Sequence, residues 1–152
     1  MEKYTTTIPR LKDMNKAQRN KRHAQRQAYY MANDTHSGQV MKFYWSAAWR
    51  NTRDAHLRQH PIDELQILSH YVYDATDVHH IIKFADQPTD ELKWMLLTDD
   101  ENLLSLTAHT HQCVHYNKKE LTQDMLTLIN QRKQHLLEKY ISLGYQITMT
   151  DD

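Results

Sequence analysis

Two sets of closely spaced histidines have side chains and spacings that could support chemistry. His111 and His115 lie four residues apart in "AHTHQCVHYNKKE", a segment typical of a helix. Both imidazoles then project from one helix face and can reach one metal ion. The chain has eleven histidines, so this spacing taken alone favours two solvated helix residues over a metal site.

His79 and His80 are neighbours in the apolar run "DVHHII", where β-branched residues indicate a strand. Successive strand side chains point to opposite faces of a sheet. We therefore expect the two histidines to have different tasks. One would face the helix as a further metal ligand, and the other would point to the other side, toward a substrate.

The elements that must position these histidines follow from the surrounding patterns. One or two short strands are expected within "HYVYDATDVHHII", then a polar loop, and a second strand around Leu103–Leu106. A helix follows Thr107, and a long amphipathic helix covers about Leu121–Leu143 and ends at Gly144. Before the strands, we expect a basic helix capped by Asp13, a linker "NDTHSGQ", and a helix that starts at Ser46 and stops at Pro61.

Length and composition restrict the class of protein. A chain of 152 residues favours one domain, or a domain with an added arm. Its two glycines and three prolines favour a helix-rich chain. The single cysteine, Cys113, excludes a disulfide framework and a cysteine-based zinc site. No segment approaches eighteen consecutive apolar residues, and the amino terminus lacks a signal-peptide pattern, so we expect a cytoplasmic protein without a membrane partner.

The net charge of zero conceals an uneven distribution. Residues 1–60 carry twelve Lys and Arg against four acids, a net charge of +8, and the remainder carries seven against fifteen, a net charge of −8. Such an asymmetry suggests that the basic part meets a polyanion, most commonly nucleic acid. A solvated helix face with ordinary charges explains the pattern equally well.

With these features together, the sequence resembles the HNH, or ββα-metal, nucleases. A strand ending in "DVHHI", a variable loop, the strand "ENLLSL" and a helix bearing the last histidines follow the order of that family. The resemblance covers about residues 44–119. "HH" followed by "ENLLSLTAHTHQCVH" is similar to the colicin-type branch, and "FYWSAAWRNTRDAHLRQHP" is similar to the basic lead-in helix of phage HNH proteins encoded near packaging genes.

The resemblance implies a fold and a set of roles. The fold would be α+β and mainly helical, with a basic amino-terminal arm over residues 1–40 and a nuclease domain over residues 41–152. Its ββα-metal core would span about residues 71–119, followed by the long carboxy-terminal helix. His80 would be the general base, and Asn102 would brace the loop that holds it. The metal ligands would be His79, His111 and His115.

These roles imply a metal-dependent endonuclease that hydrolyses DNA phosphodiester bonds. The cofactor would be one divalent ion, drawn from zinc, nickel, manganese or magnesium, and three imidazoles favour zinc or nickel in affinity. If the chain is phage-encoded, it would act in the host cytoplasm, with packaging proteins as candidate partners. DNA contacts are expected from basic residues near the motif, against the alternative that they are only solvated: Arg50, Arg53, Arg58, Lys83 and Lys118.

One departure from the phage relatives concerns a second, structural zinc held by two C-x2-C pairs. The matching positions here carry Asp63, Gln66, Thr107 and Thr110, which make a poor zinc cage. We therefore expect that packing has replaced this zinc. Two other functions stay open: an HNH-fold protein that binds DNA or assists packaging without catalysis, and a helical structural protein whose histidines are incidental.

Overall fold

The computed structural model describes residues 14–32 and 36–150. The chain forms two compact units, Met1–Lys42 and Phe43–Asp152. Helix α1 (Lys16–Ala32) belongs to the first unit. Asn15 starts it, because its Oδ1 accepts from Gln18 N at 2.8 Å while Gln18 Oε1 accepts from Asn15 N at 3.0 Å, the reciprocal arrangement of a capping box. The expected cap, Asp13, lies outside the described residues.

The described part of the first unit is basic. Residues 14–32 contain no Asp or Glu, and their positive side chains lie on α1: Lys16, Arg19, Lys21, Arg22 and Arg26. Helix α2 covers His36–Tyr44. The expectation of a linker through residues 33–39 is therefore wrong for His36–Gln39, which are helical, and residues 33–35 lie outside the described residues.

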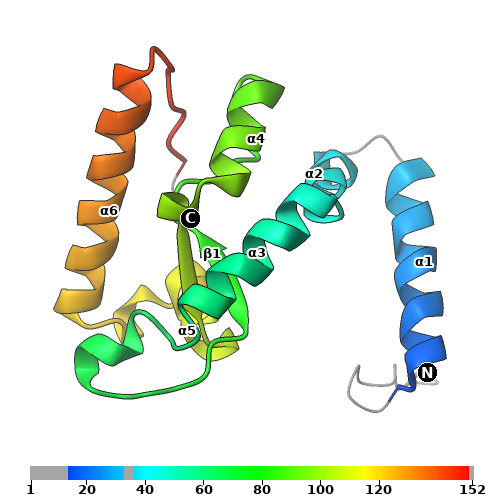
Figure 1. Ribbon diagram of the computed structural model, residues 1–152, viewed down its shortest axis with the longest axis horizontal. Helices are drawn as coiled ribbons and strands as arrows, with labels where there is room; N and C mark the ends of the chain where they lie inside the picture. The colour runs from blue at the N-terminus through cyan, green and yellow to red at the C-terminus, as the bar shows by residue number, and fades with distance from the viewer. Residues whose placement is uncertain (1–13, 33–35, 151–152) are drawn as a thin grey trace, which may run out of the picture. The chain divides into compact units, whose positions relative to one another are not determined.

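The second unit contains a two-stranded antiparallel hairpin surrounded by helices (Figure 1). Its elements, in chain order, are α3 (Ala47–Gln59), the 3-10 turn η2 (Gln66–Ser69), β1 (Asp77–His80), α4 (Asp90–Thr98), η3 (Asp100–Asn102), β2 (Leu103–Leu106), α5 (Ala108–Tyr116), η4 (Lys118–Glu120) and α6 (Gln123–Ser142). In the view of Figure 1 the hairpin lies between α3 and α6, and α3 and α5 each contact both strands.

Helix α3 has the expected ends. Ser46 Oγ accepts from Trp49 N at 3.1 Å and caps the first turn, and the helix ends at Gln59, shortly before Pro61. Trp49 and His56 form the buried side of the helix. The helix therefore places one aromatic ring and one imidazole against the hairpin.

The hairpin pairs His79 with Leu104 and His80 with Leu103, and β2 is buried along its whole length. The long connection between the strands contains α4, where a polar loop leading to the second strand was expected and no helix. Thr89 caps this helix by accepting from Leu92 N at 3.3 Å, and Asp90 and Glu91 fill its first turn. Its leucines Leu92, Leu96 and Leu97 are fully buried, and the helix packs against α3 and η3.

Helix α6 ends as the sequence indicates. Gly144 has a left-handed φ of 89°, and Tyr145 N donates back to Tyr140 O at 3.0 Å, which reverses the chain. The segment that follows returns beside α6 toward the hairpin (Figure 1). There Thr148 exchanges two hydrogen bonds of 2.9 Å with the buried amide of Gln87.

The expected α+β class, mainly helical around a small ββα core, is confirmed. β1, β2 and α5 follow one another as strand, strand and helix within Asp77–Tyr116. None of the helices in residues 14–32 and 36–150 has both the length and the apolar character needed to cross a membrane.

Candidate active site

Three of the expected site residues meet between β1 and α5. The ligand nitrogens of His79, His111 and His115 all lie within 4.8 Å of one another. His79 comes from β1, and the other two occupy one face of α5, as their spacing indicates. The ring centroid of His79 lies 5.3 Å from that of His111 and 4.8 Å from that of His115. The structure thus brings together the three histidines predicted to bind a metal.

The separation of the nitrogens suits a shared ion. Nε2 of His115 and Nε2 of His111 are 3.1 Å apart and face each other. Zinc–imidazole bonds are about 2.0–2.1 Å long, so two ligands at tetrahedral angles have nitrogens roughly 3.3 Å apart. The residues present therefore fit a divalent ion that imidazole prefers.

Asp77 orients one of these histidines. Its Oδ2 lies 2.9 Å from Nδ1 of His111, so this nitrogen carries the proton that it donates to the carboxylate and leaves Nε2 facing the cluster. Asp77 was not among the site residues predicted from the sequence. The signal was its position two residues before His79, because alternate strand residues share one face.

Burial keeps His79 neutral. Its side chain is 5% exposed, and this burial lowers the pKa of the imidazole well below its usual value, with further lowering by the nearby charges of His115 and His111. A metal ligand must be the unprotonated imidazole. The environment of His79 therefore favours the form that can bind an ion at neutral pH.

His80 points to the opposite side of the strand, as the alternation predicts. Its ring lies against α3, with centroids 4.7 Å from Trp49 and 5.1 Å from Phe84. Nε2 donates to the carbonyl of Leu97 at 3.1 Å, which leaves Nδ1 as the acceptor nitrogen. Burial lowers the pKa of His80 to about 4, although the bond to Leu97 opposes this shift, so the ring is neutral at pH 7.

Asn102 braces the chain immediately after the two histidines. Its Oδ1 accepts from Ile82 N at 2.7 Å, and its Nδ2 donates to Ile82 O at 3.0 Å and to Leu96 O at 2.9 Å. The side chain is fully buried. These bonds tie the segment that leaves β1 to α4, which is the contact expected of a residue that positions His80.

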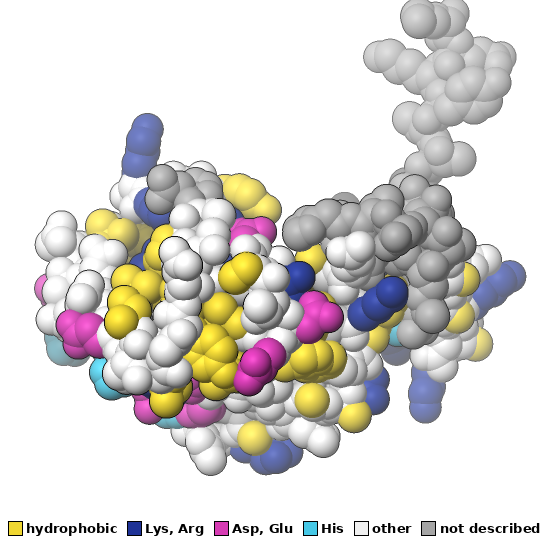
Figure 2. Space-filling model, turned by 90° about the horizontal axis from the view of Figure 1, so that it is seen from above, with side chains coloured by type: hydrophobic (Ala, Val, Ile, Leu, Met, Phe, Trp, Pro, Cys, Tyr) yellow, Lys and Arg dark blue, Asp and Glu magenta, His cyan; other side chains and the backbone are white. Residues whose placement is uncertain are grey.

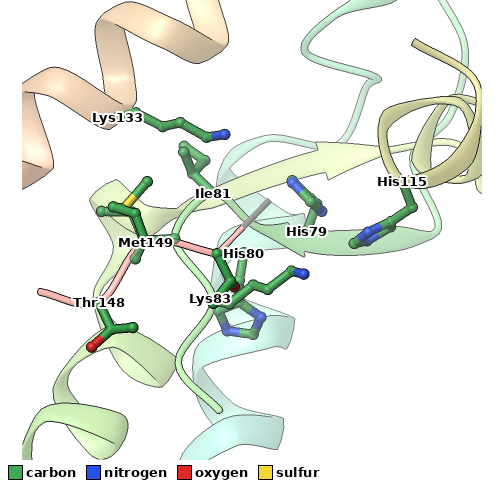
Figure 3. Close-up of a pocket in the computed structure, with 10 residues that line it drawn as sticks. His79, His80, Ile81, Lys83, His115, Lys133, Thr148 and Met149 are labelled. Atoms are coloured by element: carbon green, nitrogen blue, oxygen red, sulfur yellow. The ribbon is translucent and has the colours of Figure 1, made fainter. Parts of the chain in front are cut away.

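One pocket is lined by both adjacent histidines, His79 and His80, and by two lysines. Figure 3 shows His79 and His115 at the pocket, with Lys133 reaching toward it from α6. His80 and Lys83 also line it, and the returning segment contributes Thr148, Met149 and Thr150 along its border. Lys133 was missed because it lies far from the motif in sequence. The charges of Lys83 and Lys133 are placed to meet an anionic group.

The other residues expected to contact DNA are distributed more widely. Arg50 donates to Trp45 O at 2.9 Å, and Arg53 pairs with Asp54 at 3.2 Å and reaches Thr76 O at 3.3 Å. Arg58 and Lys118 are exposed on α3 and η4. On the face of the second unit that Figure 2 shows, Lys and Arg side chains are scattered, with acidic and hydrophobic side chains between them. The structure does not gather these four residues into one patch with the histidines.

The four positions where the resemblance would place a structural zinc do meet, in a hydrogen-bonded network. Asp63 accepts from Gln66 N at 2.8 Å and, through its other oxygen, from Thr107 N at 2.9 Å. Gln66 Nε2 donates to Thr110 Oγ1 at 3.2 Å, and the hydroxyls of Thr107 and Thr110 are 3.0 Å apart. Both oxygens of the one carboxylate already accept N–H groups, so the set does not fit zinc. Polar side-chain and backbone contacts join these segments.

The resemblance to HNH nucleases drawn from the sequence is confirmed in the ββα core with its histidine cluster. No family model and no curated protein matches the sequence. Among solved structures, the chain is similar to the crystal structure of the HNH endonuclease of the deep-sea thermophilic bacteriophage GVE2 with manganese ion. That match covers 55% of this chain and 86% of that chain, with 25% sequence identity and a TM-score of 0.46.

Proposed function

We propose that this protein is a metal-dependent endonuclease that hydrolyses phosphodiester bonds in DNA. The observation that carries the proposal is the convergence of His79, His111 and His115, whose nitrogens lie within 4.8 Å of one another on the β1–β2–α5 core. These three residues would hold one divalent ion, with Asp77 orienting His111. Three imidazoles favour zinc or nickel in affinity, and manganese remains a candidate.

Each protein group then has a task suited to phosphodiester hydrolysis. The bound ion would supply Lewis-acid stabilisation of charge on the phosphate. His80 would be the general base, because its Nε2 is committed to the Leu97 carbonyl and its Nδ1 is left as an acceptor. Asn102 would hold the backbone after His80 in place through Ile82. Lys83 and Lys133 would attract the phosphate to the pocket, which His79, His80 and His115 also line.

Charge supports DNA as the substrate. The +8 over residues 1–60 suits the phosphate backbone of nucleic acid and carries no sequence preference by itself. Within residues 14–32, the Lys and Arg side chains lie on helix α1, and this stretch contains no Asp or Glu. We propose that α1 binds the duplex non-specifically, and that Arg50, Arg53 and Arg58 of the second unit also contact DNA. Phage origin and a link to DNA packaging remain predictions that rest on the sequence resemblance.

The test compares the two neighbouring histidines. His79→Ala removes a ligand, so we expect weaker metal binding and slower cleavage in proportion. His80→Ala removes the base and should leave metal binding intact while slowing single-turnover cleavage by roughly two to four powers of ten. His80→Gln is the matched variant, because its amide can still donate to the Leu97 carbonyl while it cannot accept a proton as imidazole does.

Metal titration, plasmid cleavage and thermal unfolding are measured on all three variants. Equal loss of metal affinity in the His79 and His80 variants would refute the division of tasks. Full activity in a folded His80→Gln protein would refute the mechanism.

A non-catalytic DNA-binding role is the second candidate. The observation that favours it is the packing of His80 against Trp49 and Phe84, which resembles a structural core position. Under this alternative the wild-type protein would bind plasmid DNA and leave it uncut at every divalent metal tested.

A further inference from the structure

A second group of metal-ligating side chains lies at the carboxyl end of α3. Ligand atoms of His56, His60 and Glu64 all lie within 4.8 Å of one another, and the group shares no residue with the cluster on β1 and α5. We propose that these three residues form a second metal site, for a divalent transition-metal ion such as zinc, which fastens the end of α3 to the segment that follows it.

The two histidines are placed by helix geometry. His56 and His60 are four residues apart at the end of α3, so their rings lie on one face, with centroids 4.6 Å apart. Nδ1 of His56 lies 2.7 Å from Asp100 Oδ1 and donates to it, which leaves Nε2 directed at Glu64. A ligand histidine commonly has its second nitrogen held in this way by a carboxylate.

Glu64 is held by β2 from the other side. Its backbone N donates to Ser105 O at 2.9 Å, and its Oε2 accepts from Ser105 N at 2.6 Å. Oε2 also lies 3.0 Å from Nε2 of His56, while Oε1 lies 3.5 Å from Nδ1 of His60. These separations bracket the roughly 3.3 Å between ligands around a tetrahedral zinc ion. The carboxylate is therefore fixed where it can complete a His2Glu set.

The surroundings provide charge balance and access. Glu64 and Asp100 bring two negative charges, and Arg132 Nη2 lies 3.8 Å from Glu64 Oε1. The positive charge of Arg132 disfavours a cation beside Glu64. The Arg132 side chain is 33% exposed and its Nη1 also donates to Glu101 O at 3.4 Å, so it can move away from Glu64 when an ion binds. An open pocket lined by Gln59, His60, Pro61, Ile62, Glu64 and Ile67 admits an ion and a water ligand from solvent.

The chemistry of the set decides the class of ion. Two imidazole nitrogens and one carboxylate oxygen suit zinc, cobalt or nickel, whereas magnesium and calcium prefer sites made of oxygen. The site joins α3 to β2 through Glu64, so its expected effect is on stability. This role is independent of the proposed nuclease reaction, in which neither His60 nor Glu64 takes part.

The test is a titration of the metal-free, full-length protein with cobalt(II), followed by its visible absorption bands. The variants are His60→Asn, His115→Asn and the double variant, with His70→Asn as the control. His60 is partly exposed, so its loss should not disturb the core. His70 is exposed and has a left-handed φ of 65°, which asparagine tolerates.

We expect two cobalt ions per chain in the wild type and in His70→Asn, one in each single variant, and none in the double variant. Each single substitution should lower the cobalt affinity of the site that it alters by at least about tenfold. Substitution of a residue that only hydrogen-bonds to a metal ligand already causes a loss of this size. Cobalt should raise the thermal unfolding temperature of His115→Asn and fail to raise that of the double variant.

Two results would overturn the proposal. One is a His115→Asn protein that is folded by circular dichroism and binds no cobalt, because the second site would then not exist. The other is a His60→Asn protein that still binds two ions, because the second ion would then lie elsewhere. Failure of the nuclease site gives a different pattern, in which His115→Asn binds as much cobalt as the wild type.

Discussion

Replacing Asn102 by alanine tests how the structure holds the end of the strand that carries His79 and His80. The side chain is fully buried and makes three hydrogen bonds to backbone groups of Ile82 and Leu96, both themselves buried. Alanine removes all three bonds and leaves the Ile82 N–H and two carbonyl groups without these partners. The chain after β1 would lose its attachment to α4, and His80 would lose the support of the segment that follows it.

The expected cost follows from those bonds. A typical hydrogen bond contributes about 0.5–1.5 kcal/mol net, and a buried group left unpaired costs about 1–3 kcal/mol. Water entering the space would recover part of this cost, so we expect the free energy of unfolding to fall by about 3 kcal/mol. With a urea m-value of about 2 kcal/mol/M, the midpoint would shift down by roughly 1.5 M.

The assay is urea unfolding followed by circular dichroism, with Asn130→Ala as the control. Asn130 is exposed on α6, where alanine is a good helix former, so this variant should unfold at or slightly above the wild-type midpoint. Cleavage at low temperature, where Asn102→Ala is still folded, should be slower while the affinity of the three histidines for metal stays near the wild-type value. A loss below about 0.5 kcal/mol would refute the bracing role.

Two further predictions concern the arm and the metal. Deleting residues 1–40 should weaken DNA binding and reduce the dependence of log affinity on log salt by about 0.9 for each phosphate that the arm neutralises, as measured by fluorescence anisotropy at several salt concentrations. An unchanged salt slope would exclude the arm from binding. Chelation should strip the cluster of His79, His111 and His115 without unfolding the second unit, because the Asp63 network does not depend on metal. Loss of the helical circular dichroism signal on chelation would contradict this.

The local patterns that could be predicted are those governed by nearby residues. Ser46 and Gly144 mark helix ends because a cap and a left-handed turn depend on a few consecutive residues. The alternation of a strand separated His79 from His80 correctly. Helix α4 was missed, although Thr89 followed by two acids is a helix-start signal. Its run of leucines suits a buried helix and a buried strand equally, and packing against distant segments such as α3 decides between them.

Which of the two neighbouring histidines joins His111 and His115 was predictable only through the resemblance. The gathering of His79 with His111 and His115 depends on the β1–β2–α5 arrangement, which periodicity alone does not specify. Lys133 and the returning segment at Thr148 approach the same pocket from the carboxy-terminal part of the chain, and no local pattern marks them. Likewise, His56 and His60 carry the same four-residue spacing as His111 and His115, and only the position of Glu64 shows that they form a group.

The four positions at which the resemblance implies a structural zinc in phage relatives are joined in this chain by hydrogen bonds. Zinc would tie two segments by bonds to four side chains, whereas here the carboxylate of Asp63 links them by accepting from the backbone of Gln66 and of Thr107. Hydrogen bonds to a charged acceptor are stronger than neutral ones, at about 1.5–3 kcal/mol each. The amide of Gln66 and the two threonine hydroxyls then satisfy one another rather than an ion. This polar network positions the start of α5, and therefore His111 and His115, and needs no metal ion to do so.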